Sequence, residues 1–122
     1  MQMDYINKVF SLEGKKAIIT GGTQGIGRAI AMSLAKLGAD VTVLGRNKKY
    51  LEEVKNELDD LGVKGAAYEI DVSVQSQVED FFDIYEKETG RLDIYVNNAA
   101  FTIRKRAMET TQEEMDTLYA TN

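Results

Sequence analysis

The sequence predicts an α/β protein built on a doubly wound parallel sheet, and three observations support this prediction. Short apolar runs alternate with amphipathic segments in the order β-α-β-α-β-α-β-α. The connections between them are short, which is typical of parallel strands joined by right-handed helical crossovers. The first apolar run is continuous, as expected of a strand that is buried on both faces. No internal repeat or linker interrupts the 122 residues, so we expect one domain, or part of one, over residues 1–122.

Each predicted strand is an apolar run that is followed by a glycine, an aspartate or an asparagine. The four strands are expected at Lys15–Thr20, Val41–Leu44, Ala66–Ile70 and Leu92–Val96. Between them apolar residues recur at helical spacing, first over Gly25–Leu37. We expect Asn47 to cap the second helix and Ser73 the third, because short polar side chains accept hydrogen bonds from a helix's first turn. The capping-box residues Thr110 and Thr111 predict the start of a fourth helix.

The composition limits the chemistry that this chain can perform. It has no cysteine and no histidine, which excludes disulfides, thiolate nucleophiles, Cys/His zinc sites and histidine acid–base catalysis. The net charge of −5 disfavours attraction to nucleic acid or to anionic membranes. No segment approaches the roughly 20 apolar residues of a membrane helix, and the first ten residues lack the apolar stretch of a secretory signal. We therefore expect a cytoplasmic protein with no metal, nucleic-acid or membrane partner.

Three glycines, Gly21, Gly25 and Gly27, lie between the first strand and the first helix. Ligands of such sheets bind beyond the carboxyl ends of the strands, where the N–H groups of a helix start favour a phosphate. Gly21 would allow a tight turn, Gly25 a close approach of the backbone to phosphates, and Gly27 close packing of the helix. Thr23 adds a hydroxyl donor. The spacing matches neither a Walker A loop nor G-x-G-x-x-G, and in this context it predicts nucleotide binding.

Four markers, in order, resemble the short-chain dehydrogenase/reductase family. The stretch "TGGTQGIG" matches the family's TGxxxGxG pattern. Asp71 follows the third strand, where the family places an aspartate near the adenine. The stretch "NNAA", Asn97–Ala100, resembles the family's NNAG motif, with an alanine in place of the glycine. Asn122 falls on the asparagine that joins the family's catalytic group through water.

The resemblance runs from Phe10 to Asn122 and favours the shorter, single-domain branch. It implies a Rossmann-type fold, of which this chain holds the N-terminal half, and hydride transfer between a nicotinamide and a carbonyl or alcohol carbon. Branches that act on gluconate-like sugar acids, on tropinone and on 3-oxoacyl-carrier-protein substrates are comparably similar. The implied catalytic residue is Asn122. The implied cofactor-binding residues are Gly21, Thr23, Gln24, Gly25, Ile26, Gly27, Arg46, Asn47, Asp71, Val72, Asn98, Ala99 and Ala100.

The residues that follow the second strand predict a preference for NADP(H) over NAD(H). An acidic residue there would bind the 2′-hydroxyl of the ribose and repel a 2′-phosphate. This chain has Gly45, Arg46 and Asn47 instead, and a guanidinium pairs well with a phosphate. The alternative is that Arg46 is a solvated surface arginine. Gln24 stands where many NADP-preferring relatives carry a second basic residue.

The sequence lacks the family's Tyr-x-x-x-Lys motif, in which the tyrosine is the acid–base and the lysine lowers its pKa. We therefore expect a chain that is truncated before the catalytic half and is inactive by itself in hydride transfer. Two alternatives stay open at this point. The chain is a non-catalytic NADP(H)-binding module, or it is a structural domain with an empty loop.

The substrate is expected to be a small carbonyl or alcohol compound. Arg104, Lys105 and Arg106 could meet an anionic substrate, or they form a solvated basic turn. Homo-oligomers are usual in the family, and we expect one for a full-length protein. Asp71 could instead cap the third helix, and the aromatic residues of that helix are interpreted as core: Phe81, Phe82 and Tyr85.

Overall fold

A computed structural model describes residues 9–98 of the chain. It contains a parallel sheet with the strand order β3-β2-β1-β4. The strands are β1 (Lys16–Thr20), β2 (Asp40–Gly45), β3 (Gly65–Glu69) and β4 (Ile94–Asn97). The helices between them are α2 (Gly25–Lys36), α3 (Lys48–Asp60) and α4 (Gln75–Glu88). The predicted α/β fold is thereby confirmed, while the expected fourth helix lies outside the described residues.

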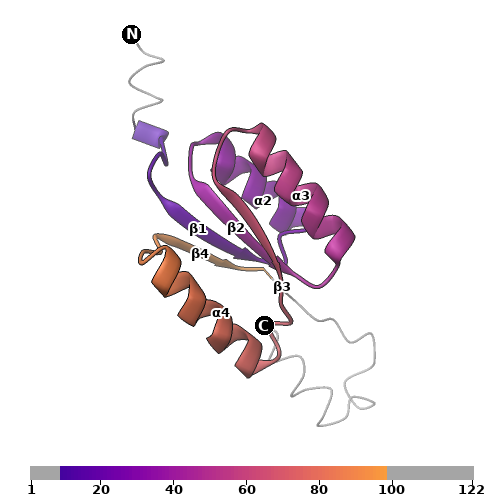
Figure 1. Cartoon of the computed structure of the whole chain (residues 1–122). Helices are drawn as coiled ribbons and strands as arrows, with labels where there is room; N and C mark the ends of the chain where they lie inside the picture. The colour runs from indigo at the N-terminus through magenta and orange to yellow at the C-terminus, as the bar shows by residue number, and fades with distance from the viewer. Residues whose placement is uncertain (1–8, 99–122) are drawn as a thin grey trace, which may run out of the picture.

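The helices cover both faces of the sheet. Figure 1 shows α2 and α3 together on one face and α4 on the other. The strand order explains this layering, because the chain adds β2 and β3 on one side of β1 and then crosses to the other side for β4. Right-handed crossovers in opposite directions place their helices on opposite faces. The structure is therefore the doubly wound sheet that the sequence predicts.

The central strand β1 carries the core on both of its faces, as its continuous apolar run predicts. Ala17 and Ile19 pack toward α2 and α3, against the buried Val54 and Leu58 of α3. The next residue along, Ile18, points to the other face and packs in a smaller cluster with Phe81 of α4. Because side chains alternate between the faces of a strand, one short run supplies both clusters.

Helix α2 approaches the sheet through small side chains. Its buried residues are Gly27, Ala31 and Ala35, whereas Ile26 is 74% exposed. The apolar residues on which the helix was predicted are therefore only partly in contact with the core, and Ile30 and Leu34 pack at its margin. A stripe without large side chains lets the helix backbone come close to the strands, which brings the glycine loop down onto the end of the sheet.

The two predicted helix caps have different outcomes. Asn47 caps α3, since its side-chain oxygen accepts a hydrogen bond from Tyr50 N at 3.2 Å. The prediction for Ser73 is wrong, because α4 has Val74 at its cap position and no side-chain cap hydrogen bond. The Ser73 hydroxyl and N–H both donate to a carboxylate oxygen of Asp71, at 2.6 and 3.0 Å. This local turn satisfies the serine before the helix begins, so Asp71 does not cap α4 either.

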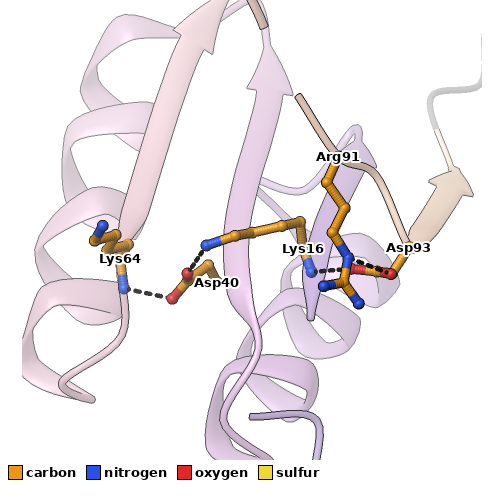
Figure 2. A network of polar contacts seen from close by, with 5 residues as sticks. All are labelled: Lys16, Asp40, Lys64, Arg91 and Asp93. Carbon is orange, nitrogen blue, oxygen red and sulfur yellow. Dashed lines mark hydrogen bonds and ion pairs between the residues drawn. The ribbon is translucent and has the colours of Figure 1, made fainter. Parts of the chain in front are cut away.

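Charged side chains connect the N-terminal ends of the strands (Figure 2). Asp40 pairs with the Lys16 ammonium and accepts from Lys64 N at 3.1 Å. Asp93 accepts from Lys16 N at 2.8 Å and from Arg91 Nε at 2.9 Å. Burial works against the ionised Asp40, but the hydrogen bonds from Lys16 and Lys64 outweigh it and hold the pKa of Asp40 below its ordinary value. The hydrogen bond from Lys16 N lowers the pKa of Asp93 in the same way, against its desolvation.

These charges lie at the opposite edge of the sheet from the glycine loop, so they serve the fold and leave the other edge for a ligand. In residues 9–98 no helix combines the length and the apolar character that a membrane crossing requires.

Candidate functional site

A cleft of about 400 Å³ opens beyond the carboxyl ends of the strands. In a doubly wound sheet this is the edge at which ligands bind. The loops after β1, β2 and β3 form its walls, and Asn98, directly after β4, closes one end. Its lining residues are Gly21, Thr23, Gln24, Leu44, Gly45, Arg46, Asn47, Tyr50, Ile70, Asp71, Val72 and Asn98.

The glycine loop forms one wall of the cleft, and its geometry favours glycine at three positions. Gly25, with a φ of +56°, is one of them. Gly21 has a φ of +64°, and its N–H donates to Leu44 O at 2.9 Å, which makes a tight turn at the end of β1. A Cβ at Gly27 would lie 2.2 Å from Gly21 O and 2.4 Å from Asn98 Nδ2. The start of α2 therefore rests directly on the loop, and any larger residue at position 27 would lift it.

The first turn of α2 is open to a ligand. Gln24 occupies its N-cap position in an extended conformation but makes no side-chain cap hydrogen bond. A Cβ at Gly25 would meet no atom within 4 Å. The N–H groups of a first turn have no partner within their helix and carry the positive end of its dipole. Because no side chain caps this turn and no atom crowds Gly25, the turn has room for the phosphates of a dinucleotide.

Polar groups of β1 and β4 hold the loop from below. Thr20 is fully buried, and its hydroxyl donates to Asn97 Oδ1 at 3.0 Å and accepts from Asn98 N at 2.9 Å. The Asn98 side chain donates to Gly21 O at 3.3 Å. The two asparagines of the "NNAA" stretch are thus linked to the glycine loop through one buried hydroxyl.

Arg46 stands at the wall where β2 ends. Of the three arginines in residues 9–98, it is the one that makes no hydrogen bond or ion pair with another described residue. Arg28 is held by carboxylates of α3, and Arg91 is held by Asp93. A solvent-exposed guanidinium that pairs with none of residues 9–98 remains able to bind an anion. The β2–α3 connection, Arg46 and Asn47, contains no carboxylate that would repel one.

Asp71 lies on the far wall, after β3. Hydrogen bonds from the Ser73 hydroxyl and the Ser73 N–H hold the pKa of Asp71 below its ordinary value, against the opposing effect of burial. The positive charge of Arg46 lowers this pKa further. The carboxylate is therefore ionised at neutral pH and can accept a hydrogen bond from a ligand's amine.

The structure brings most of the predicted cofactor residues to this cleft. Those that line it are Gly21, Thr23, Gln24, Arg46, Asn47, Asp71, Val72 and Asn98. Three others lie beside it in the glycine loop: Gly25 and Ile26 are exposed, and Gly27 is buried beneath the loop. Ala99, Ala100 and Asn122 lie outside the described residues, as does the basic stretch of residues 104–106, and their roles stay predictions.

Sequence reasoning missed four lining residues and one residue behind the loop. The lining residues are Leu44, Gly45, Tyr50 and Ile70. The residue behind the loop is Arg28, which contacts Glu53 and Glu57. The spacing of those two glutamates, one turn apart on the predicted second helix, was the available signal for a basic partner on a neighbouring helix. No three His, Cys, Asp or Glu side chains of residues 9–98 gather in a way that could hold a metal ion.

The comparisons with known proteins decide the family. A family model described as short chain dehydrogenase matches residues 15–122, which is most of the chain. The chain belongs to the short-chain dehydrogenase/reductase family. This confirms the resemblance that the glycine loop, Asp71 and the "NNAA" stretch indicated. The cleft is therefore that of a member of an oxidoreductase family.

Individual members of the short-chain dehydrogenase/reductase family share about a third or more of the aligned residues. Gluconate 5-dehydrogenase of Gluconobacter oxydans (strain 621H) is 35% identical over 93% of this chain and 44% of its own length. A chloroplastic tropinone reductase homologue of Arabidopsis thaliana is 42% identical over 93% of this chain and 35% of its own length. The crystal structure of L-sorbose reductase from Gluconobacter frateurii, complexed with NADPH and L-sorbose, superposes with a TM-score of 0.85 at 31% identity. That match covers 92% of this chain and 43% of the reductase.

The chain spans less than half the length of each of these relatives. The shared part is the N-terminal portion of the Rossmann fold with its glycine loop. What the relatives bind and transform as whole proteins therefore supports only a proposal for this chain.

Proposed function

We propose that this chain is the NADP(H)-binding half of a short-chain dehydrogenase/reductase. The nicotinamide, when bound, supplies or accepts a hydride at a carbonyl or alcohol carbon of a small substrate. In this proposal, residues 1–122 form the NAD(P)-binding domain, and the acid–base tyrosine lies in sequence beyond it. By itself the chain is then expected to bind the cofactor without turning it over.

Each wall of the cleft has a part in holding the dinucleotide. The open first turn of α2 and the backbone of Gly21 to Gly25 would hold the pyrophosphate. Asp71 would accept a hydrogen bond from the adenine amine, and Val72 and Ile70 would contact the ring's edge and face. These assignments follow from the position of each residue on the cleft and from the ionised state of Asp71.

The guanidinium of Arg46, which makes no hydrogen bond or ion pair within residues 9–98, is the observation that carries the choice of NADP(H). It lies where the adenosine ribose of a Rossmann dinucleotide is recognised. The 2′-phosphate would give this planar guanidinium a doubly charged acceptor for paired hydrogen bonds, which a hydroxyl cannot replace. The neighbouring Asn47 uses its side-chain oxygen to cap α3 and keeps its amide N–H₂ group for donation. The NADPH bound to L-sorbose reductase is consistent with this choice.

Replacement of Arg46 by alanine tests the proposal. A charge-assisted hydrogen-bonded contact is worth about 1.5–3 kcal/mol, so the dissociation constant for NADPH should rise about 10- to 100-fold. The constant for NADH should change little, because NADH has no 2′-phosphate. Quenching of the intrinsic fluorescence or the shift in melting temperature measures both constants. Lys49→Ala, which removes an exposed positive charge from the first turn of α3, is the control for bulk electrostatics.

Two results would contradict the proposal. If Arg46→Ala weakened the binding of NADPH and of NADH equally, Arg46 would not be the residue that binds the 2′-phosphate. Absence of binding of either nucleotide to the unmodified protein would favour the structural alternative with an empty loop.

A further inference from the structure

The described part of the glycine loop has two carbonyl oxygens that accept hydrogen bonds from side chains. Gly21 O accepts from Asn98 Nδ2 at 3.3 Å, and Thr23 O accepts from Arg28 Nη1 at 3.4 Å. Asn98 lines the cleft at the β4 side, whereas Arg28 lies behind the loop at the α3 side and does not line the cleft. A carbonyl oxygen repels a phosphate, so a loop that binds phosphates must keep its carbonyls turned away.

Arg28 is itself fixed by helix α3. Its Nη1 lies 3.6 Å from Glu53 Oε2, and its Nη2 pairs with Glu57 Oε1. The Arg28 side chain is 26% exposed, so these contacts are partly shielded from water. The planar fork of an arginine can serve a carbonyl and two carboxylates at fixed angles, which the single ammonium of a lysine cannot. The side chain thus joins the glycine loop to the helix that begins just after Arg46.

The contact also orients a peptide group of the loop. In a trans peptide the C=O and the following N–H point in opposite directions, and the described chain contains no cis peptide bond. While Arg28 holds Thr23 O on the α3 side, Gln24 N–H must point away from Arg28. Thr23 and Gln24 both line the cleft, so this orientation turns a donor, and not an acceptor, toward a phosphate.

We propose that Arg28 is a positioning residue for the dinucleotide, which holds the Thr23 carbonyl back and sets the spacing between the glycine loop and α3. The inference rests on the proposed cofactor site but concerns a residue that does not touch the cofactor. Two carboxylates neutralise its charge, so it adds no net attraction for phosphate. Its effect is therefore on the pyrophosphate loop, which NADPH and NADH share.

The test compares Arg28→Met with Arg46→Ala in cofactor binding. Methionine keeps an unbranched apolar stem and the helix propensity of arginine but cannot donate a hydrogen bond. Arg28→Met should weaken the binding of NADPH and of NADH by the same factor, about tenfold or more. Arg46→Ala should weaken the binding of NADPH alone. Arg28→Lys should recover part of the loss for both nucleotides, because an ammonium can serve one of the three acceptors.

Glu57→Gln provides a milder variant that leaves Arg28 in place. Glu57→Gln should weaken the binding of NADPH and of NADH by the same factor. Added to Arg28→Met, it should cause little further loss of binding, because both changes release the same contact. Lys55→Gln is the matched control, since it breaks another carboxylate ion pair of α3, Lys55 to Asp59 at 2.6 Å, away from the loop. Lys55→Gln should leave both dissociation constants unchanged.

The outcomes separate this inference from the proposed function. If the unmodified protein binds NADPH and both Arg28→Met and Glu57→Gln bind it equally well, Arg28 has no positioning role. If the losses from Arg28→Met and Glu57→Gln multiply independently, or fall on NADPH alone, the loop-orienting explanation is wrong. If the unmodified protein binds neither nucleotide, the proposed function fails first, and this inference fails with it.

Discussion

Replacement of Gly27 by alanine is the sharpest test of how this sequence builds its glycine loop. Gly27 belongs to the first turn of α2, has no positive φ and is buried. In an ordinary helix an alanine would be favoured over glycine by about 1 kcal/mol, because glycine loses more backbone entropy on folding. Helix propensity by itself therefore predicts a more stable protein.

The contacts of position 27 predict the opposite. The new Cβ would lie 2.2 Å from Gly21 O and 2.4 Å from Asn98 Nδ2, far inside van der Waals contact. The Gly21 backbone cannot retreat freely, because its N–H is bonded to Leu44 O at 2.9 Å. Overpacking typically costs about 1–3 kcal/mol, and displacement of Asn98 costs a further ~1 kcal/mol for its hydrogen bond to Gly21 O. After the helix-propensity gain, we expect a net loss of about 2 kcal/mol.

Urea unfolding followed by far-UV circular dichroism measures this difference. Ser33→Ala, at an exposed position of the same helix, is the control and should stabilise by a few tenths of a kcal/mol (roughly). The Gly27→Ala protein should also bind NADPH and NADH less tightly, because α2 must lift from the loop. A Gly27→Ala protein that is as stable as the unmodified protein, or more stable, would refute the reasoning from close contact.

Two further predictions concern stability. Asp40, Asp71 and Asp93 have pKa values below their ordinary range, so their contribution is complete above the unfolded pKa of about 3.9 and is lost as pH falls through the lower folded values. The midpoint of urea unfolding should stay constant from pH 7 to about pH 4 and then fall. Asp40→Asn should make this fall smaller, and an unchanged pH profile in Asp40→Asn would contradict a stabilising role of the Asp40 carboxylate. Thr20→Val removes the acceptor of Asn98 N, which lies 2.9 Å away, and should cost about 1–3 kcal/mol in thermal unfolding; an unaltered melting temperature would show that this hydroxyl is dispensable.

The strands could be predicted from sequence because each is a short apolar run in a chain whose other apolar residues follow helical spacing. Their ends could not be placed as well. The fourth strand was expected at Leu92–Val96 and is found at Ile94–Asn97. Its start depends on Asp93, whose carboxylate accepts from Lys16 N at the beginning of β1. A strand begins where a neighbouring strand can form backbone hydrogen bonds with it. The local sequence pattern does not show where that neighbouring strand lies.

Helix α2 shows why the buried face of a helix can escape a sequence pattern. Hydrophobic spacing marks Ile26 and Leu37 as members of an apolar stripe, yet both are exposed. The face that packs on the sheet consists of Gly27, Ala31 and Ala35. A close approach of backbones selects small side chains, and small residues give a weak hydrophobic signal. Arg28 was missed for a different reason, because its carboxylate partners lie on another helix.

The sequence alone predicts the alternation of strands and helices, the glycine loop after the first strand, and an arginine in place of an acid after the second. These are local features, because backbone preference and side-chain chemistry act over a few residues. The folded structure alone shows that Asn98 and Arg28 donate to carbonyl oxygens of the same loop. It also shows that, within residues 9–98, Arg46 makes no hydrogen bond or ion pair, whereas Arg28 pairs with two carboxylates. Such pairings depend on which elements the sheet brings side by side, and distances between chain segments far apart in sequence exist only once the sheet has formed.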